Sequence, residues 1–438
     1  MKLDKKNTVL IGFAFLSICA FWQMYDNLVP LMLTNTFHMN EVFSGAIMAA
    51  DNVLALFLLP LFGALSDKCR SPLGRRRPFI LFGSLAAIVL MMALPVLNDS
   101  YRAAPSTGKM VAFVVVLGVL LVAMGTYRSP AVALMPDVTP KPLRSKANAV
   151  INLMGAVGGI IYLLLTTFLY TDKSADASYL PLFAIVAGIM LLALIVLMTL
   201  VNEPKLVARQ RDYEKQHPEE DLAVETPTGE KLPAAVKKSL GFLLCSIALW
   251  FVAYNGVTTW FTTYAQNQWS MTLSQSSMCL TIATAGAIVS YIPVGQVASK
   301  IGRRKTIRFG TLLLSGSFAA AFVYTLFSHS FHPALYGLFA VVGIAWASIN
   351  VNSLPMVVEM CSDGEVGKFT GLYYTFSMTA QIATPILAGA LMRYLGYHLL
   401  FAYSAIFAFL SYITMNFVRH GDNKIVAKKG LEAFDVED

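Results

Sequence analysis

The sequence predicts an all-α membrane protein with twelve transmembrane helices in two six-helix halves. Hydrophobic residues make up 56% of the 438 residues, charged residues only 13%, and the mean hydropathy is +0.62. A soluble globular chain carries about 25% charged residues. Twelve apolar runs each approach the roughly 20 residues that a helix needs to cross the hydrocarbon core. A single long polar stretch, residues 202–238, separates six runs from six.

The twelve runs follow one another with short polar breaks. The first is too long for a secretory signal, carries Asp26 well inside it and is followed by no small-residue cleavage site, so we expect a retained span. The expected spans are 8–33, 43–65, 78–97, 110–134, 147–170, 180–201, 239–264, 272–297, 307–327, 334–358, 369–392 and 398–418.

The basic residues predict the orientation of the chain in the membrane. If the N-terminus is cytoplasmic, 28 of the 33 Lys and Arg residues fall on the inner side. The positive-inside rule therefore places both termini in the cytoplasm of a multi-pass protein of the plasma or bacterial inner membrane. The net charge of +8 reflects this topology, so it indicates the lipid bilayer and no nucleic acid as a partner.

A repeated loop indicates that the two halves arose by duplication. GALSDKCRSPLGRRR follows the second span, and GQVASKIGRRK follows the eighth span at the equivalent place. We expect an N-terminal half at 1–201, a flexible, charged cytoplasmic linker at 202–238, a C-terminal half at 239–418 and a cytoplasmic tail at 419–438.

The repeated loop resembles the signature of the major facilitator superfamily. Its longer form, SDKCRSPLGRRRPFIL, is similar to the sucrose and proton symporter group and, more loosely, to the glycoside, pentoside and hexuronide cation symporters. The similarity continues at Pro130, Ala133, Leu134, Asp137, Ala147, Asn148, Ala149, Ala156, Val157, Gly158, Gly367, Gly371 and Gln381. The resemblance implies a monomeric transporter that works by alternating access.

Two positions depart from the pattern of the sucrose symporters. The aspartate that they place in the fourth helix falls here on Leu121, and their sugar-binding arginine falls on Val132. An arginine occurs one helical turn earlier, at Arg128, and acidic residues occur instead in the first two helices. The resemblance therefore leaves sucrose itself open as a substrate.

Charges inside the spans are the strongest functional signal, because a charge in a bilayer costs at least ~2.5 kcal/mol on insertion scales. Asp26 lies about two-thirds of the way out along the first span and Asp51 about a third of the way in along the second, so both reach a similar depth. Two neighbouring carboxylates can hold and release a proton, which proton coupling requires. The alternative is that each is a structural polar anchor.

Arg128 lies in the inner half of the fourth span. Its guanidinium could bind a solute hydroxyl or carboxylate, or balance one of the aspartates. This charge keeps acidic sugars and organic anions among the candidate solutes.

Amide, hydroxyl and aromatic side chains recur in several spans and suit a sugar, whose hydroxyls and apolar ring face they could contact. Interhelical packing is the alternative for each single residue. The candidate solute-binding residues are Gln23, Asn27, Arg128, Tyr254, Asn255, Asn350, Asn352 and, from the resemblance, Gln381.

The two basic loops are expected to act as conformational gates. Gly permits a tight turn, and Asp and Arg can form a charge-assisted contact in one conformation that is lost in another. The gate set is Asp67, Gly74, Arg75, Arg76, Asp137 and Arg144 in the first half, and Gly302, Arg303, Arg304 and Glu359 in the second.

No motif of an enzyme, a phosphate-binding loop or a metal-binding helix is visible, and the five cysteines show no metal or disulfide spacing. We therefore expect no catalysis, cofactor or metal. The sequence favours proton-coupled symport of a sugar or glycoside. Proton-driven export of an amphipathic or organic-anion solute and a non-transporting membrane sensor remain as alternatives.

Overall fold

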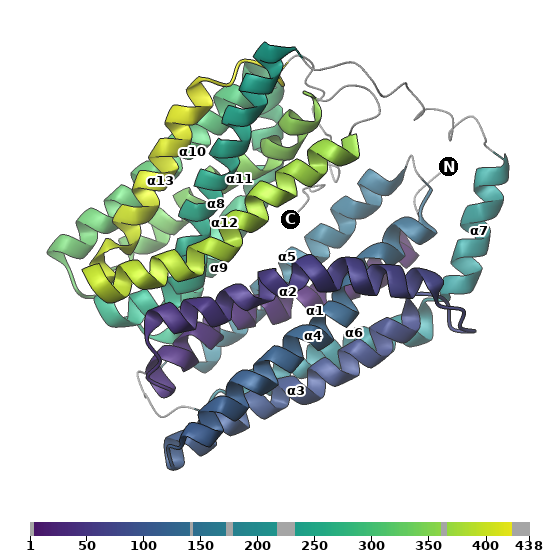
Figure 1. Cartoon of the computed structure of the whole chain (residues 1–438), viewed down its shortest axis with the longest axis horizontal. Coiled ribbons are helices and arrows are strands. Elements are labelled where there is room, and N and C mark those ends of the chain that lie inside the picture. Colours follow the sequence, from purple (N-terminus) through teal and green to yellow (C-terminus); the bar gives the residue numbers. More distant parts are fainter. Residues whose placement is uncertain (1–3, 141–142, 172–177, 217–232, 361–365, 423–438) are drawn as a thin grey trace. The chain divides into compact units, whose positions relative to one another are not determined.

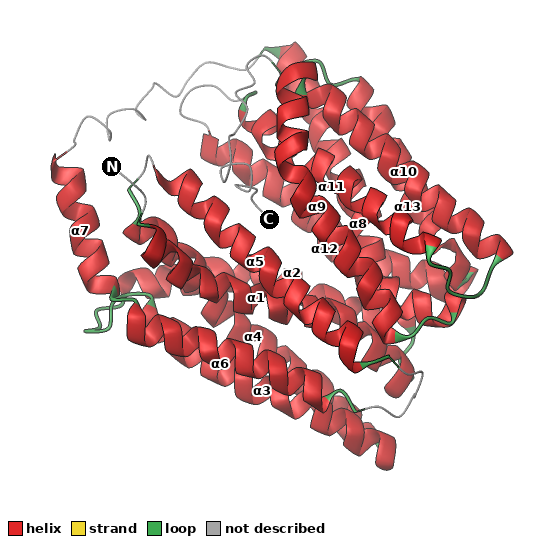
Figure 2. Cartoon of the chain, turned by 180° about the vertical axis from the view of Figure 1, so that it is seen from behind, coloured by secondary structure: helices red, strands yellow, loops and turns green. Residues whose placement is uncertain are grey.

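The computed structural model describes residues 4–140, 143–171, 178–216, 233–360 and 366–422, and this part of the chain is helical, without a β-strand (Figures 1 and 2). The helices are α1 (Lys5–Leu31), the π-helical η1 (Met32–Thr36), α2 (Glu41–Lys68), α3 (Arg77–Ala103), α4 (Thr107–Val138), α5 (Arg144–Leu169), α6 (Leu180–Leu200), α7 (Glu203–Gln216), α8 (Ala234–Trp269), α9 (Leu273–Ile301), α10 (Arg303–Phe327), α11 (Ala334–Val358), α12 (Val366–Leu395), the 3₁₀ turn η5 (Tyr397–Leu399) and α13 (Leu400–Asn416).

Twelve of the described helices are long and apolar enough to cross a membrane, which confirms the predicted fold class. Most extend beyond the predicted spans: the fourth covers 107–138 where 110–134 was expected, and the seventh covers 234–269 where 239–264 was expected. Apolar runs report only the hydrocarbon core, whereas backbone hydrogen bonding continues through the polar interface. The helix ends are therefore longer than hydropathy alone indicates.

The segment expected to be a flexible linker begins with a helix. Residues 203–216 form α7, and residues 234–238 already belong to α8. Residues 217–232 of this segment, and 423–438 of the predicted tail, lie outside the described residues. Residues 203–216 are thus helical, and α7 buries Glu203 and Gln210 while exposing Lys205, Arg209 and Arg211.

The chain divides into two compact units, which are described separately. Unit 1 comprises 1–39 and 50–222, and unit 2 comprises 40–49 and 223–438. The first turns of α2 thus group with unit 2, where Tyr397 donates a hydrogen bond to Glu41 at 2.8 Å. A single chain boundary at residue 201, as predicted, does not describe the grouping of residues 40–49 with unit 2. Hydropathy carries no information on which neighbours a span contacts.

The helix pairing of unit 1 recurs in unit 2. In unit 1, α1 packs on α5 and α6, and α3 packs on α4 and α6. In unit 2, α8 packs on α12 and α13, and α10 packs on α11 and α13. The same order of contacts in both units is the structural counterpart of the repeated loop.

Small residues allow the closest of these contacts. Gly158 of α5 faces the backbone of Leu16, and a Cβ at Gly155 would lie 2.8 Å from the sulfur of Cys19. In unit 2, a Cβ at Gly310 would lie 2.9 Å from the carbonyl oxygen of Ala345. Close approach of helix backbones through small residues is the usual packing mode of membrane helices.

Candidate functional site

Unit 1 brings together the charges that the sequence places inside the spans. Asp26 of α1 and Asp51 of α2 are close enough for their charges to interact, and Asp51 also interacts electrostatically with Arg128 of α4. Asn52 donates a hydrogen bond to Asp51 at 2.9 Å. These three charged residues are the only Asp, Glu, Lys or Arg side chains of the described spans that lie more than two helical turns from a span end.

An aromatic pair on α1 completes this charged cluster. The Arg128 guanidinium carbon lies 5.7 Å from the centre of the Trp22 ring, in the arrangement of a cation–π contact. Trp22 and Tyr25 pack edge to face, with ring centres 5.4 Å apart. The Trp22 indole nitrogen and the Tyr25 hydroxyl are both buried without a hydrogen-bond partner in the described structure. Trp22 and Tyr25 escaped the sequence prediction because they resemble ordinary apolar residues of a span.

Two further candidate residues of α1, Gln23 and Asn27, lie against α5. Asn27 is buried and accepts a hydrogen bond from the Tyr162 hydroxyl at 3.2 Å. Gln23 lies opposite Gly159, where an added Cβ would be 3.6 Å from its side-chain oxygen. Asn27 therefore links two helices of unit 1, which is the packing role considered as the alternative in its prediction.

In unit 2, the candidate residues of α8 lie beside an aromatic cluster. The rings of Tyr254 and Trp346 are stacked with centres 3.8 Å apart and planes within 7°. Phe251 meets Trp346 edge to face at 5.5 Å. The amide nitrogen of Asn255, the next residue along α8, is buried without a hydrogen-bond partner in the described structure. This arrangement offers a flat aromatic surface with an amide donor beside it.

The remaining candidates of unit 2 are spread over α11 and α12. Asn350 and Asn352 are both buried, and Asn352 donates to the carbonyl of Ser348 within its own helix at 3.0 Å. Ser353, three residues after Asn350, pairs with the Tyr373 hydroxyl at 3.2 Å. Gln381 is half-buried on α12.

Four of the predicted gate residues of unit 1, Asp67, Arg75, Arg76 and Asp137, form one ionic network at the face where α1, α3 and α5 begin, which we call the basic face. Arg76 is 6% exposed and contacts Asp67 at 2.5 Å and Asp137 at 2.8 Å. Arg75 also reaches Asp137, at 3.4 Å. Burial alone would lower the pKa of Arg76, but hydrogen bonding and the charges of Asp137 and Asp67 outweigh it and raise that pKa. Arg76 thus joins α2, α4 and the start of α3.

Glu203 anchors this network and was missed by the sequence prediction. Its carboxylate is 1% exposed and accepts hydrogen bonds from the backbone N–H groups of Arg75 at 2.7 Å, Arg76 at 3.0 Å and Arg77 at 3.0 Å. Gly74, with φ of +112°, turns the chain so that a Cβ at this position would overlap Glu203. The carboxylate therefore binds the positive end of α3.

Unit 2 repeats this arrangement with different residues. Asp422 accepts a hydrogen bond from the Arg303 N–H at 2.6 Å, at the start of α10 and next to Gly302, whose φ is +100°. The Arg303 side chain pairs with Glu359. Glu203 and Asp422 both lie a few positions after the last span of their half. This shared position is the sequence signal that could have identified them.

Not every predicted gate arginine pairs with an acid. Arg144 donates to the carbonyls of Thr139 at 3.2 Å and Pro136 at 3.0 Å, and Arg304 donates to the carbonyl of Asn416 at 2.7 Å. Both thereby satisfy carbonyl groups near the C-terminal end of a helix, where a positive charge is favourable.

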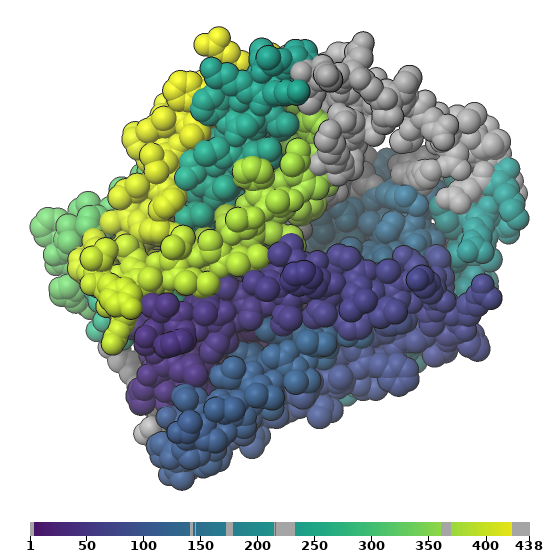
Figure 3. All heavy atoms as spheres, viewed as in Figure 1, coloured from purple at the N-terminus to yellow at the C-terminus, as the bar shows by residue number. Residues whose placement is uncertain are grey.

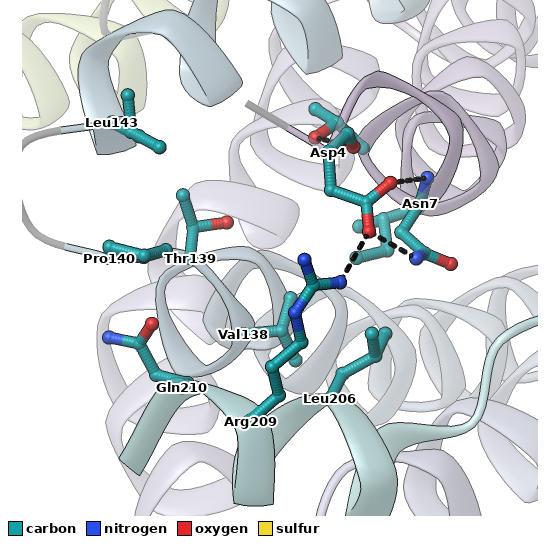
Figure 4. A pocket seen from close by; sticks show the side chains of 11 residues that line it. Asp4, Asn7, Val138, Thr139, Pro140, Leu143, Leu206, Arg209 and Gln210 are labelled. Atoms are coloured by element: carbon teal, nitrogen blue, oxygen red, sulfur yellow. Dashed lines mark hydrogen bonds and ion pairs between the residues drawn. The ribbon is translucent and has the colours of Figure 1, made fainter. Parts of the chain in front are cut away.

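A pocket opens at the basic face of unit 1 between α1, α4, α5 and α7 (Figure 4). Asp4 caps α1 through Asn7 and forms an ion pair with Arg209 of α7 at 3.1 Å. Figure 3 shows α7 in teal at one end of the purple and blue helices of unit 1. Together with Glu203, this ion pair ties the first half of α7 to the other helices of unit 1.

Within the described residues, no group of His, Cys, Asp or Glu has the arrangement of a metal site.

The family model described as Major Facilitator Superfamily matches residues 11–272 and 264–433. Sucrose transport protein SUC3 of Arabidopsis thaliana is 34% identical over 138 residues, which cover 29% of this chain and 23% of that protein. Sucrose transport protein SUC4 of the same plant is 36% identical over 114 residues, covering 24% and 22%. The matched segments thus span less than a quarter of these relatives.

Solved structures share the fold at low identity. The crystal structure of a D-xylose-proton symporter superposes with a TM-score of 0.69 at 14% identity and covers 96% of this chain and 99% of that one. A bacterial homologue of the iron transporter ferroportin, in an inward-facing state, gives a TM-score of 0.68 at 11% identity and covers 95% and 99%.

Proposed function

Because the chain belongs to the Major Facilitator Superfamily, we propose that it is a secondary active transporter that moves a sugar or glycoside together with protons by alternating access. The observation that carries the proposal is the charged cluster of Asp26, Asp51 and Arg128. It is the one place in the described membrane interior where a proton can be exchanged between carboxylates.

The polar and aromatic residues of unit 2 support a sugar as the solute. Stacked Tyr254 and Trp346 offer an apolar surface of the kind that contacts a pyranose ring, and the Asn255 amide adds a donor for a hydroxyl. The partial similarity to sucrose transport proteins agrees with this solute class. The aromatic surface carries no charge, which suits a neutral ring.

The proposed orientation places the basic face of unit 1 and both termini in the cytoplasm, as the positive-inside rule indicates. The ionic networks around Arg76 and Arg303 then lie on the cytoplasmic side. We propose that they hold one conformation of the gate and loosen in another, in a transporter that functions as a monomer.

Purified protein in proteoliposomes containing a pH-sensitive dye provides the test. Addition of sucrose, maltose, glucose or a methyl glucoside outside, without an imposed gradient, should acidify the lumen for the transported sugar. A pH change of the opposite sign would support export by proton antiport. No pH change and no uptake of any sugar would refute the proposal.

A further inference from the structure

The two aspartates of the charged cluster differ in their hydrogen-bond and charge partners. Asp51 receives a hydrogen bond from Asn52 at 2.9 Å and interacts electrostatically with the positive charge of Arg128. Asp26 makes no hydrogen bond with the described residues, and its charged neighbour is Asp51. Only Asp51 therefore has a donor and a counter-charge at hand.

The remaining titratable neighbours of Asp26 do not supply a positive charge. Tyr25 precedes it on α1, and Tyr162 of α5, which hydrogen-bonds to Asn27, lies within electrostatic range of it. A carboxylate without a counter-charge in a membrane interior is expensive, and binding a proton removes that cost. Asp26 is thus the member of the cluster best suited to carry a proton.

Arg128 has hydrogen-bonding capacity that the described residues do not use. Its guanidinium lies over Trp22, and it forms no ion pair or hydrogen bond with them. Since Arg128 and Asp51 interact without direct contact, an atom between them could bond to both. A sugar hydroxyl can accept from the guanidinium and donate to the carboxylate at the same time.

Two further donors lie on the same helix as Asp26. The Trp22 indole N–H and the Tyr25 hydroxyl are buried and lack partners in the described structure. Buried polar groups are normally satisfied, so these two are suited to oxygen atoms of a bound solute. Trp22 also positions Arg128 through the contact with its ring.

The charges of the cluster favour an uncharged solute. With Asp26 and Asp51 ionised and Arg128 positive the cluster carries one net negative charge, and a single proton makes it neutral. A neutral sugar preserves that balance. A carboxylate-bearing solute would restore a net negative charge in a poorly solvated site, which is unfavourable.

We propose that the three charges divide two tasks: Asp26 carries one transported proton, whereas Asp51 and Arg128 together bind a hydroxyl of a neutral sugar. This division rests on the proposed function. It assigns a solute class, an uncharged sugar or glycoside, and adds Trp22 as the residue that positions Arg128.

The test compares two kinds of transport in proteoliposomes made from the full chain. Radiolabelled sucrose, maltose and glucuronate are the probes, each measured for uphill accumulation driven by a pH gradient and for exchange at equal pH. Asp26→Asn should lower accumulation at least tenfold while exchange changes less than threefold, because exchange moves no net proton. Asp51→Asn should lower both at least tenfold, because it removes a solute contact.

Three further variants separate these roles from a folding defect. Asp26→Glu should restore at least part of the accumulation that Asp26→Asn loses. Trp22→Phe should raise the KM for the sugar while the pH dependence of accumulation stays unchanged. Asp99→Asn, at the far end of α3, where Ser178 donates to Asp99 at 2.5 Å, is the matched control outside the cluster.

The outcomes distinguish the inference from the proposed function. Three results would each overturn the division of tasks. The first is a preference for glucuronate over both sugars, and the second is loss of exchange in Asp26→Asn with Asp26→Glu equally inactive. The third is full exchange in Asp51→Asn. A wild-type protein that moves none of the three probes would refute the proposed function, and the division would fall with it.

Discussion

Replacing Glu203 with Gln should loosen the start of α3 and leave the rest of unit 1 intact. The buried carboxylate accepts from three backbone N–H groups at 2.7–3.0 Å and lies at the positive end of the helix. Gln keeps one acceptor oxygen, but its amide group turns a donor toward backbone donors and the negative charge is lost. Hydrogen bonds to a charged group contribute about 1.5–3 kcal/mol each. We expect a local loss of about 2–3 kcal/mol.

Amide hydrogen exchange followed by mass spectrometry measures this loss directly. At 1.36 kcal/mol per tenfold change, the amides of residues 75–77 should exchange about 30- to 150-fold faster in Glu203→Gln. Asp212→Asn is the matched control, because it removes the same charge from an exposed position on the same helix. The control should leave exchange at residues 75–77 unchanged.

The result for unit 2 provides an internal comparison. Glu203→Gln should not alter exchange at the start of α10, whose N–H group binds Asp422. If Glu203→Gln exchanges no faster at residues 75–77 than Asp212→Asn does, the carboxylate does not hold the start of α3. The reasoning on both acidic caps would then be refuted.

Two other predictions concern the polar ends of the units. Gly302→Ala should destabilise the protein by about 1–3 kcal/mol, because φ is +100° and a Cβ would lie 2.5 Å from the Asp422 carboxylate. Thermal unfolding should show a lower Tm than for the control Gly241→Ala, where the added Cβ meets nothing within 4 Å. Equal Tm values for the two variants would contradict this prediction. Burial alone would raise the pKa of Asp4, but hydrogen bonds from Asn7 and the charge of Arg209 lower it overall, so its stabilisation should be complete above about pH 4 and lost as the pH falls through the lowered pKa. Because the ion pair between Asp4 and Arg209 is largely exposed, Asp4→Asn, which still caps α1, should speed amide exchange in α7 by no more than about fivefold at pH 7. A larger increase at pH 7 would show that Asp4 holds α7 in another way. Exchange in α7 of the wild type that already rises between pH 8 and pH 5 would show the same.

The charges of the sequence were informative because a membrane imposes a high cost on them. Asp26, Asp51 and Arg128 stand out in apolar runs, and the structure brings them into one cluster in unit 1. Trp22 and Tyr25 could not be identified in the same way. An aromatic residue is unremarkable in a span, and only the packing of α1 shows that their polar atoms lack partners.

The repeated loops predicted where the ionic networks lie but not how they are built. The spacing of Gly and Arg located the turns at Gly74 and Gly302, and both have positive φ values. The acids that bind the following helix starts are Glu203 and Asp422, which lie 129 and 120 residues beyond those glycines. A pattern of neighbouring residues holds no information on contacts of that sequence separation.

The sequence by itself determined the class of fold and the number of spans, because both depend on a solvent-imposed pattern of apolar and charged residues along the chain. The tertiary structure decided which partners each charge has. Arg76 meets two aspartates, whereas Arg304 and Arg144 meet backbone carbonyls. Helix packing brings together residues that are distant in sequence, and the strength of an ionic or hydrogen-bonded contact depends on that proximity rather than on residue type alone.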